Sequence, residues 1–295
     1  MNQTISLIGN TPMYNIENSN IYVKLEKFNV GGSVKDRAVL GMLQEAMKKG
    51  DIDPSSVLVE ATSGNTGVAL AMLGAIYHIP VIIFMPETMS NERRQLVKAY
   101  GAKLELTPGS KGMQGALEAM NAKIEEDPKK YHSLLQFDNY DNCKAHYETT
   151  GKEILEQVEH IDIFVACVGT GGTFSGVSKR LKEHDEHILC IAGEPEHSAI
   201  LSGQDAGPHK IQGIGANFVP KNFDREICDD IMLVSNEEAL KETVNFARET
   251  GILVGISSGA NIALAKRLAW RNRDKTIVTI APDGGEKYLS VLDFD

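Results

Sequence analysis

A lysine in an unusual position is the first residue of this sequence that could carry chemistry. Lys35 lies in GGSVKDR (31–37), where the pattern predicts a helix starting at Val34, with Ser33 as N-cap and Asp36 as capping-box partner. The first turn of a helix favours anions over cations. A partly desolvated lysine near positive potential is favoured as a neutral amine, which can form a Schiff base with an aldehyde. A solvated surface lysine is the simpler alternative.

A glycine-rich turn between the apolar run IFVACV and a predicted helix could hold a phosphate. Its residues are Gly169, Thr170, Gly171, Gly172 and Thr173. Glycines let the backbone approach a ligand closely, and the N–H groups at the start of a helix favour an anion. A tight turn with no ligand is the alternative.

A second turn, TSGNTG (62–67), follows the apolar run VLVEA and is rich in hydrogen-bonding side chains. They belong to Thr62, Ser63, Asn65 and Thr66. Such a loop at the carboxyl end of a strand suits a carboxylate, although a purely structural turn is an equal alternative. Pyridoxal phosphate combines an aldehyde, a phosphate and a substrate carboxylate in one site, and the three segments together match that combination.

A dinucleotide site is the main competing interpretation of the glycine-rich turn. An acidic residue, Glu194, follows it after about 20 residues, as a ribose-binding site requires. Phe174 replaces the third glycine of that fingerprint, and the P-loop pattern is broken because Asp36 follows Lys35. A nicotinamide-dependent oxidoreductase and a catalytically idle, partner-binding homologue remain as alternatives from other classes.

The elements that must position these turns alternate between short apolar runs and amphipathic helical patterns. The expected strands are 21–26, 57–61, 81–86, 103–107, 133–137, 163–168, 188–194, 231–235 and 276–281, and helices are expected between them, one of them from Val68. Continuous apolar strands separated by helices predict parallel sheets covered on both faces. With 295 residues, we expect an α/β fold of two domains, with a boundary in FDNYDNC (137–143).

Composition excludes several classes of function. The net charge is −10, and no run of Lys or Arg exceeds two, which argues against a nucleic-acid partner. The N-terminus does not resemble a signal peptide, and the apolar runs are far shorter than the ~20 residues of a membrane span. Four scattered cysteines without a CxxC pair and eight histidines without an HxH or HxxxH pair predict a cytoplasmic protein with no metal site.

Motifs along nearly the whole chain resemble those of one enzyme family. They are LIGNTP (7–12), NVGGSVKDR (29–37), EATSGNTG (60–67), MPETMSNERR (85–94), QFDNYDN (136–142), TTGKEI (149–154), GTGGT (169–173), GIGANF (213–218), GISSGA (255–260) and GGEKYLS (284–290). The chain is thereby identified as a member of the cysteine synthase (O-acetylserine sulfhydrylase) family of fold-type II pyridoxal-phosphate enzymes. EATSGNTG, MSNERR and AHYETTG are more similar to the B isozyme, whereas GISSGAN and APDGGEKYLS are more similar to the A isozyme, so the chain is somewhat closer to the B isozyme.

The resemblance implies a fold and a role for each matching residue. The fold would be like that of the tryptophan synthase β subunit, with a smaller domain at 36–140 and a larger one formed by 1–35 and 141–295. Lys35 would bind pyridoxal phosphate as a Schiff base and move the α-proton, and Asn65 would bind the phenolic oxygen of the cofactor. The other implied roles are the substrate carboxylate for Thr62, Ser63, Thr66 and Gln136, the cofactor phosphate for Gly169–Thr173, and the pyridine nitrogen for Ser257.

The implied reaction is β-replacement on a serine-like amino acid through an aminoacrylate. A serine hydroxyl such as that of Ser257 can bond the pyridine nitrogen without protonating it, which favours elimination over transamination; helix N-capping is the alternative role for this residue. The expected reaction is cysteine synthesis from O-acetylserine and sulfide by a homodimer, with serine acetyltransferase as a possible partner. Sulfide release from cysteine, with water or a second thiol as nucleophile, is the alternative.

One residue departs from the family pattern. Asn217 stands in GIGANF where cysteine synthases usually have a glycine, in a segment that lines the substrate side in relatives. One hypothesis is that this asparagine changes which nucleophile reacts. The alternative is a tolerated loop asparagine in the left-handed conformation.

Overall fold

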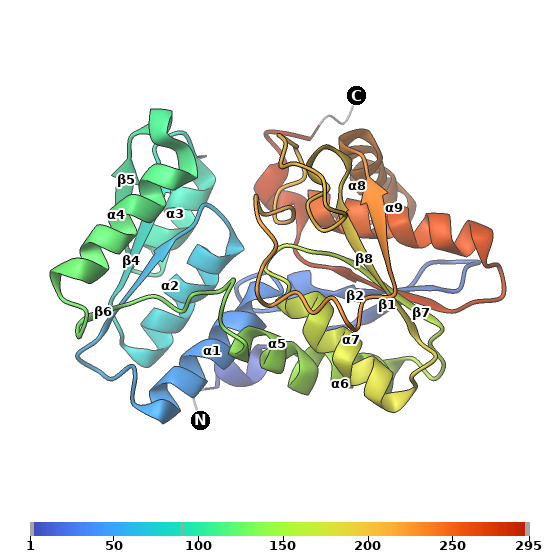
Figure 1. The fold of residues 1–295 in the computed structure, drawn as a ribbon, viewed down its shortest axis with the longest axis horizontal. Helices are drawn as coiled ribbons and strands as arrows, with labels where there is room; N and C mark the ends of the chain where they lie inside the picture. The colour runs from blue at the N-terminus through green and yellow to red at the C-terminus, as the bar shows by residue number, and fades with distance from the viewer. Residues whose placement is uncertain (1–2, 90, 293–295) are drawn as a thin grey trace.

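The protein folds around two mainly parallel β-sheets that lie in separate lobes (Figure 1). The structure is a computed structural model that describes residues 3–89 and 91–292. Ser90 of the MPETMSNERR motif lies outside the described residues. Helices cover both faces of each sheet, so each lobe has three layers, as the alternating sequence pattern predicts.

The larger sheet has six strands, and only one neighbouring pair is antiparallel. In spatial order they are β1 (Met13–Asn15), β2 (Ile21–Leu25), β10 (Ile277–Ala281), β7 (Ile163–Cys167), β8 (Leu189–Pro195) and β9 (Asp230–Val234). The antiparallel pair is β1 with β2, and β1 is a short edge strand that the sequence pattern did not indicate. Residues on the two faces of β7 alternate between two cores, which explains why this strand is apolar throughout.

Different helices cover the two faces of the larger sheet. On one face lie α8 (Asn236–Thr250) and α9 (Ile256–Arg271), and on the other lie α6 (Lys152–Gln157) and α7 (Gly172–His184). A π-helical turn at Tyr147–Gly151 joins α6 to α5 (Asp141–His146), so the helix expected between the predicted strands 133–137 and 163–168 is one helix with a wider turn inside it.

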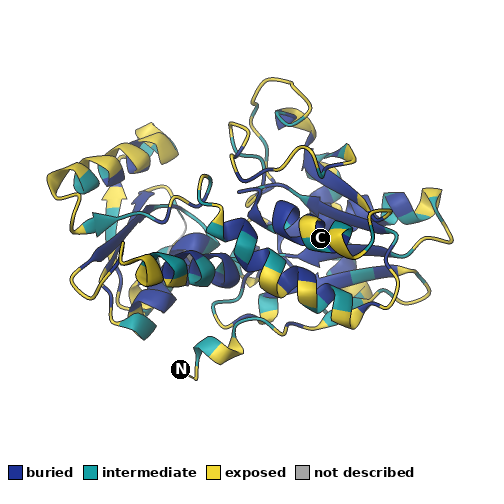
Figure 2. Cartoon of the chain, turned by 60° about the horizontal axis from the view of Figure 1, so that its bottom comes forward, coloured by how far each residue is buried: buried dark blue, intermediate teal, exposed yellow. Residues whose placement is uncertain are grey.

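The smaller sheet has four parallel strands. Their spatial order is β5 (Lys103–Thr107), β4 (Val81–Pro86), β3 (Val57–Ala61) and β6 (Tyr131–His132). On one face pack α1 (Lys35–Lys49), α2 (Asn65–Tyr77) and α3 (Asn91–Ala99), and on the other packs α4 (Gly112–Glu126). Strands β3 and β4 are buried and the edge strand β5 is partly exposed, and Figure 2 shows the exposed outer face of the helix at the outer edge of this lobe.

Short 3₁₀ helices connect these elements. They are η1 (Ile5–Leu7), η2 (Glu26–Phe28), η3 (Gly109–Lys111), η5 (Glu196–Ser198) and η6 (Gly285–Tyr288). Across the described residues, no helix is both long and apolar enough to cross a membrane. The four cysteines form no disulfide, as their scattered spacing predicts.

Two predicted elements differ from the structure. The strand expected at 133–137 is wrong: β6 ends at His132, and Leu135 has a positive φ of 52°, which an extended strand cannot accommodate. The chain turns there, and the Gln136 carbonyl accepts hydrogen bonds from Asn142 and Asn222 instead of from a neighbouring strand. The second difference is that α2 begins at Asn65, three residues before the predicted Val68.

Candidate active site

A cavity of about 520 Å³ lies between the two lobes, at the carboxyl ends of the parallel strands. Open α/β sheets bind ligands at that edge. Eight predicted site residues line it: Lys35, Thr62, Ser63, Asn65, Thr66, Gln136, Gly169 and Thr170. A small adjoining cavity of about 40 Å³ is lined by Gly171 and Thr173 as well. Another cavity, of about 460 Å³, lies against residues 132–141 and contains none of the predicted site residues.

Lys35 is the first residue of α1, but its helix is not capped as predicted. Val34 occupies the N-cap position without a side-chain bond, and the Asp36 carboxylate accepts the Gly31 N–H (2.5 Å) instead of completing a capping box. Ser33 pairs with Asp283 in a β-bridge, and its hydroxyl accepts the Lys35 N–H (3.2 Å). The bridge to the end of β10 therefore determines where the helix starts, and Lys35 lies in the first turn as expected.

The amine of Lys35 has a pKa of about 8, well below that of a free lysine. Burial is the main cause, and the negative charge of Asp283 opposes it. The part of Lys35 that remains accessible faces the cavity. A substantial fraction of the amine is therefore neutral near pH 8, as a Schiff-base lysine requires, and the solvated-lysine alternative is wrong.

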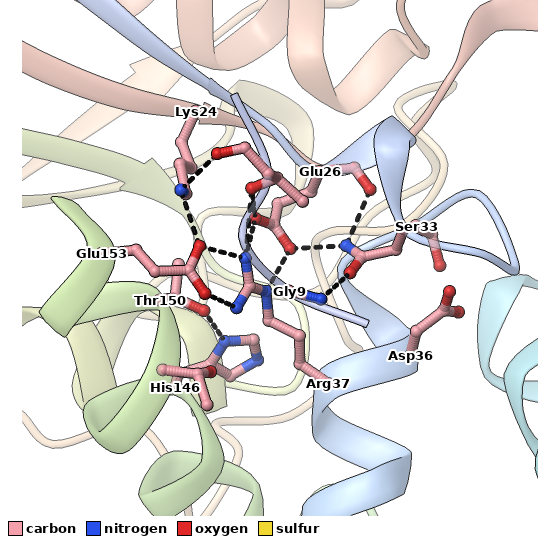
Figure 3. A network of polar contacts seen from close by, with 12 residues as sticks. Gly9, Lys24, Glu26, Ser33, Asp36, Arg37, His146, Thr150 and Glu153 are labelled. Atoms are coloured by element: carbon pink, nitrogen blue, oxygen red, sulfur yellow. Dashed lines mark hydrogen bonds and ion pairs between the residues drawn. The ribbon is translucent and has the colours of Figure 1, made fainter. Parts of the chain in front are cut away.

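A buried ionic network holds the start of α1 in place (Figure 3). Arg37 donates to both carboxylates next to it, through Nε to Glu26 (2.7 Å) and through Nη1 to Glu153 (2.6 Å). Lys24 on β2 donates to the other oxygen of Glu153 (2.7 Å). Burial alone would raise the pKa of Glu153, but the hydrogen bonds and charges of Arg37 and Lys24 lower it to about 2. The network joins α1, β2, η2 and α6 next to Lys35.

The glycine-rich turn packs so closely that side chains are excluded. A Cβ on Gly169 would lie 2.4 Å from the Gly213 carbonyl oxygen, and one on Gly171, whose φ is +86°, would lie 2.6 Å from the Phe223 nitrogen. Gly172 begins the 13-residue helix α7. Backbone N–H groups at this helix start, with the hydroxyls of the two threonines, suit a phosphate.

His146 contacts the glycine-rich turn (169–173) through Thr173, and no local sequence pattern indicates this contact. One ring nitrogen lies 2.9 Å from the Thr150 hydroxyl and the other 3.2 Å from the Thr173 hydroxyl. Burial, followed by the charges of Arg37 and Lys35, keeps its pKa far below the usual value, so the imidazole is neutral. Only the fold brings this histidine to the turn, because the two lie on different helices.

The four residues expected to bind a carboxylate come together. Thr62, Ser63, Thr66 and Gln136 line the cavity, and the Thr66 hydroxyl donates to the Gln136 side-chain oxygen (2.7 Å). Because α2 begins at Asn65, the N-terminal end of this 13-residue helix also favours an anion there.

Three residues missed by the sequence analysis surround Asn65. Its side-chain N–H donates to Asp283 (2.7 Å), and its side-chain oxygen accepts from Lys287 (2.7 Å). The Tyr288 hydroxyl donates to the same oxygen of Asp283 (2.6 Å), and Tyr288 lines the cavity. The motif GGEKYLS contained two of these residues, but nothing local indicates that they reach a loop about 220 positions earlier.

Ser257 and Asn217 lie at the margins of the site. Ser257 is the buried second residue of α9, behind Gly213, so it is not an N-cap; Gly255 holds that position. Asn217 is exposed and does not line the cavity, although its neighbour Ala216 does. It is not among the residues with positive φ, so the left-handed interpretation is wrong.

The dinucleotide interpretation loses its acidic residue. Glu194 is buried at the end of β8, where it accepts hydrogen bonds from the backbone N–H groups of Leu201 (2.8 Å) and Ser202 (3.0 Å). It stabilises a loop and does not face the cavity. Among the described residues, no group of three or more His, Cys, Asp or Glu could hold a metal ion.

Comparison with known proteins agrees with this geometry. Residues 5–283 match the family of pyridoxal-phosphate dependent enzymes. The chain belongs to this family. It is 48% identical to a cysteine synthase of Staphylococcus aureus (96% of this chain, 94% of the relative) and 44% identical to cysteine synthase B of Campylobacter jejuni (96% and 95%).

Solved structures of relatives have the same fold. A cysteine synthase from Entamoeba histolytica superposes with a TM-score of 0.96 at 43% identity, covering 99% of this chain and 90% of that one. A hydrogen sulfide-producing enzyme from Fusobacterium nucleatum gives 0.90 at 43% identity, covering 98% of each chain. The fold is thus that of fold-type II enzymes, and the protein is an enzyme that uses pyridoxal phosphate.

The residues present fit that cofactor. An amine with a lowered pKa lies in one cavity with a glycine-rich turn that has no room for side chains at 169 and 171, and a helix start follows the turn. The amine can form a Schiff base with the aldehyde of the cofactor, and the glycine-rich turn and the helix start can bind its phosphate.

Proposed function

We propose that the enzyme synthesises cysteine from O-acetylserine and sulfide. The observation that carries this proposal is that Lys35 lines one cavity together with the glycine-rich turn (169–173) and the polar loop (62–67). The cysteine synthases at 48% and 44% identity support the choice of substrates.

In this proposal each part of the site keeps the role implied by the family resemblance. Lys35 holds pyridoxal phosphate, residues 169–173 bind its phosphate, Asn65 its ring oxygen and Ser257 its ring nitrogen. When bound, the cofactor supplies an electron sink for the bond broken at the substrate α-carbon. Because a serine hydroxyl does not protonate the ring nitrogen, Ser257 limits how strong that sink is.

The protein's own side chains then bind the substrate and move the proton. Thr62, Ser63, Thr66 and Gln136 orient the substrate carboxylate, which brings the α-proton to the Lys35 amine. Lys35 removes this proton as acetate leaves the β-carbon. Sulfide adds to the β-carbon, a proton returns to the α-carbon, and the products are cysteine and acetate.

The proposal extends to the domain boundaries, the oligomeric state and the partner of the enzyme. We assign the smaller domain to 36–140 and the larger one to 1–35 with 141–295; the smaller sheet lies entirely within the first range. A homodimer in the cytoplasm, with serine acetyltransferase as a possible partner, completes the proposal. Size-exclusion chromatography with light scattering tests the dimer.

Sulfide release from cysteine is the second candidate. The hydrogen sulfide-producing relative at 43% identity supports it, as does the polar Asn217 next to the cavity-lining Ala216. In this version water or a second thiol replaces sulfide as the nucleophile.

One set of assays tests both candidates. Purified enzyme is given O-acetylserine with sulfide, or cysteine alone, and cysteine and sulfide are quantified. Borohydride reduction followed by peptide mass spectrometry should place the cofactor on Lys35. A colourless protein that binds NAD would contradict the proposal, and so would a yellow protein that reacts with no serine derivative. If Asn217→Gly leaves the ratio of the two activities unchanged, Asn217 has no role in choosing the nucleophile.

A further inference from the structure

The side chain of Asn65 is held from both sides by charged residues that reach it from the far end of the chain. Lys287 donates to Asn65 Oδ1 at 2.7 Å, and Asp283 accepts from Asn65 Nδ2 at 2.7 Å. An ammonium group has only donors and a carboxylate has only acceptors. The two partners therefore determine which way the amide faces, without the ambiguity that usually affects asparagine.

Asp283 is itself held firmly in position. Asp283 follows β10 and is fully buried. It packs so closely against Gly255 that a Cβ added to this glycine would lie only 2.0 Å from one of the carboxylate oxygens. Its backbone forms a bridge with Ser33, and the Tyr288 hydroxyl donates to the oxygen that also bonds Asn65. Because Ser33 precedes the helix of Lys35, the carboxylate that orients Asn65 is attached to the segment that carries the lysine.

We propose that Asp283 and Lys287 are positioning residues that clamp Asn65 so that its amide donates into the cavity. The amide nitrogen carries two hydrogens, and Asp283 takes one of them. The other hydrogen is then available to a ligand in the cavity that Asn65 lines, and Lys287 adds positive charge next to the amide oxygen. The donor and the lysine charge favour a ligand oxygen that is negatively charged, such as the ring oxygen of the cofactor, and they offset the negative charge of Asp283.

The inference rests on the proposed placement of the cofactor, but it does not depend on which reaction the enzyme catalyses. Its test is therefore a binding measurement. Apoenzyme is titrated with pyridoxal phosphate, and the dissociation constant and the pH dependence of the visible absorbance are recorded for wild type and variants. If wild type itself does not bind the cofactor on Lys35, the proposed function fails; the clamp is judged only on differences between variants.

The main variant is Lys287→Met, with Lys27→Met as the matched control. Lys27 is a half-buried lysine nearby that bonds the Leu253 carbonyl and Glu286, and it does not touch Asn65. We expect Lys287→Met to weaken cofactor binding about tenfold, the loss typical of one hydrogen bond to a charged group, and to shift the absorbance titration to higher pH. Lys287→Arg should recover part of the loss, and Lys27→Met should bind like wild type.

A double-mutant cycle separates a clamp from a general effect of charge. If Lys287 acts through Asn65, Lys287→Met should have no further effect in the Asn65→Ala background. Asp283→Asn, which keeps the side-chain shape, supplies a second variant should Lys287→Met not fold. Unchanged binding in both variants, or an equal loss with and without Asn65, would overturn the proposal.

Discussion

Two basic residues lie two positions apart at the start of α1, and their surroundings shift their pKa values in opposite directions. Arg37 contacts two carboxylates, and although burial works against its charge, Glu26 and Glu153 raise its pKa. Lys35 is also surrounded by protein, but the salt bridges of the described residues include none to it. Its pKa falls to about 8 because only Asp283 opposes burial.

The difference separates structure from chemistry within one helical turn. A buried charge with close partners is locked in one protonation state and one position. A buried amine without them can lose its proton near neutral pH and react. The paired arginine thus anchors the helix that presents the unpaired lysine.

Removing the reactive amine should have the largest effect. We expect Lys35→Ala to lose activity by a factor on the order of a thousand or more, because the amine is both the attachment point and the base. Unfolding by urea should show no loss of stability, since a buried, poorly compensated group has been removed. Steady-state assays measure the loss of activity, and urea titrations measure the stability. An active Lys35→Ala variant would contradict the role of Lys35 as attachment point and base.

Breaking the anchor should mainly cost stability. Arg37→Met leaves Glu26 and Glu153 buried without their main partner, and such changes typically cost about 3–5 kcal/mol of unfolding free energy. Arg271→Met, at an exposed position on α9, is the control and should change stability by less than about 0.5 kcal/mol. Equal stabilities for the two variants would show that the network does not anchor α1.

Acid should weaken the same anchor through Glu153. Its pKa is lowered from 4.5 to about 2, so the ionised carboxylate stabilises the folded state at neutral pH. Because the folded state has the lower pKa, this contribution is full above pH 4.5 and is lost as the pH falls from there toward 2. The stability gap between wild type and Glu153→Gln should therefore close over that range.

The control for this prediction is Glu156→Gln on the same helix. Glu156 is exposed and forms only a surface ion pair with Lys152 (3.7 Å). Because an exposed ion pair contributes little to stability, Glu156→Gln should have nearly the same unfolding free energy as wild type. If the stability difference between wild type and Glu153→Gln stays constant down to pH 2, the lowered pKa of Glu153 is contradicted.

The smallest expected effect comes from removing the charge of Asp283, which opposes the lowering of the Lys35 pKa. In apoenzyme, Asp283→Asn should lower the Lys35 pKa below 8 by roughly one unit, the low end for an opposite charge nearby. Competitive labelling with acetic anhydride at several pH values, read by mass spectrometry, measures this pKa. An unchanged or higher value would show that Asp283 does not stabilise the charged amine.

Local patterns were sufficient for most of the fold. Apolar runs such as 163–168 and 81–86 were found as strands because burial on both faces leaves a continuous apolar signature. The prediction of a strand at 133–137 is wrong because nothing in that run indicates the positive φ of Leu135, and one of the two donors to the Gln136 carbonyl, Asn222, lies 86 residues away along the chain. The capping box at Ser33 failed for the same reason, since Ser33 pairs with Asp283.

Local sequence specifies the parts of the site that lie within one segment: the lysine at a helix start, the glycine turn and the polar loop. Each depends on local backbone geometry and hydrogen bonding, which short motifs encode. The chemical state of those parts arises only from contacts in the folded protein. The lowered pKa of Lys35, the orientation of Asn65 and the neutral His146 all arise from burial and from partners on other elements, because electrostatic interactions depend on distance in space and not on separation along the chain.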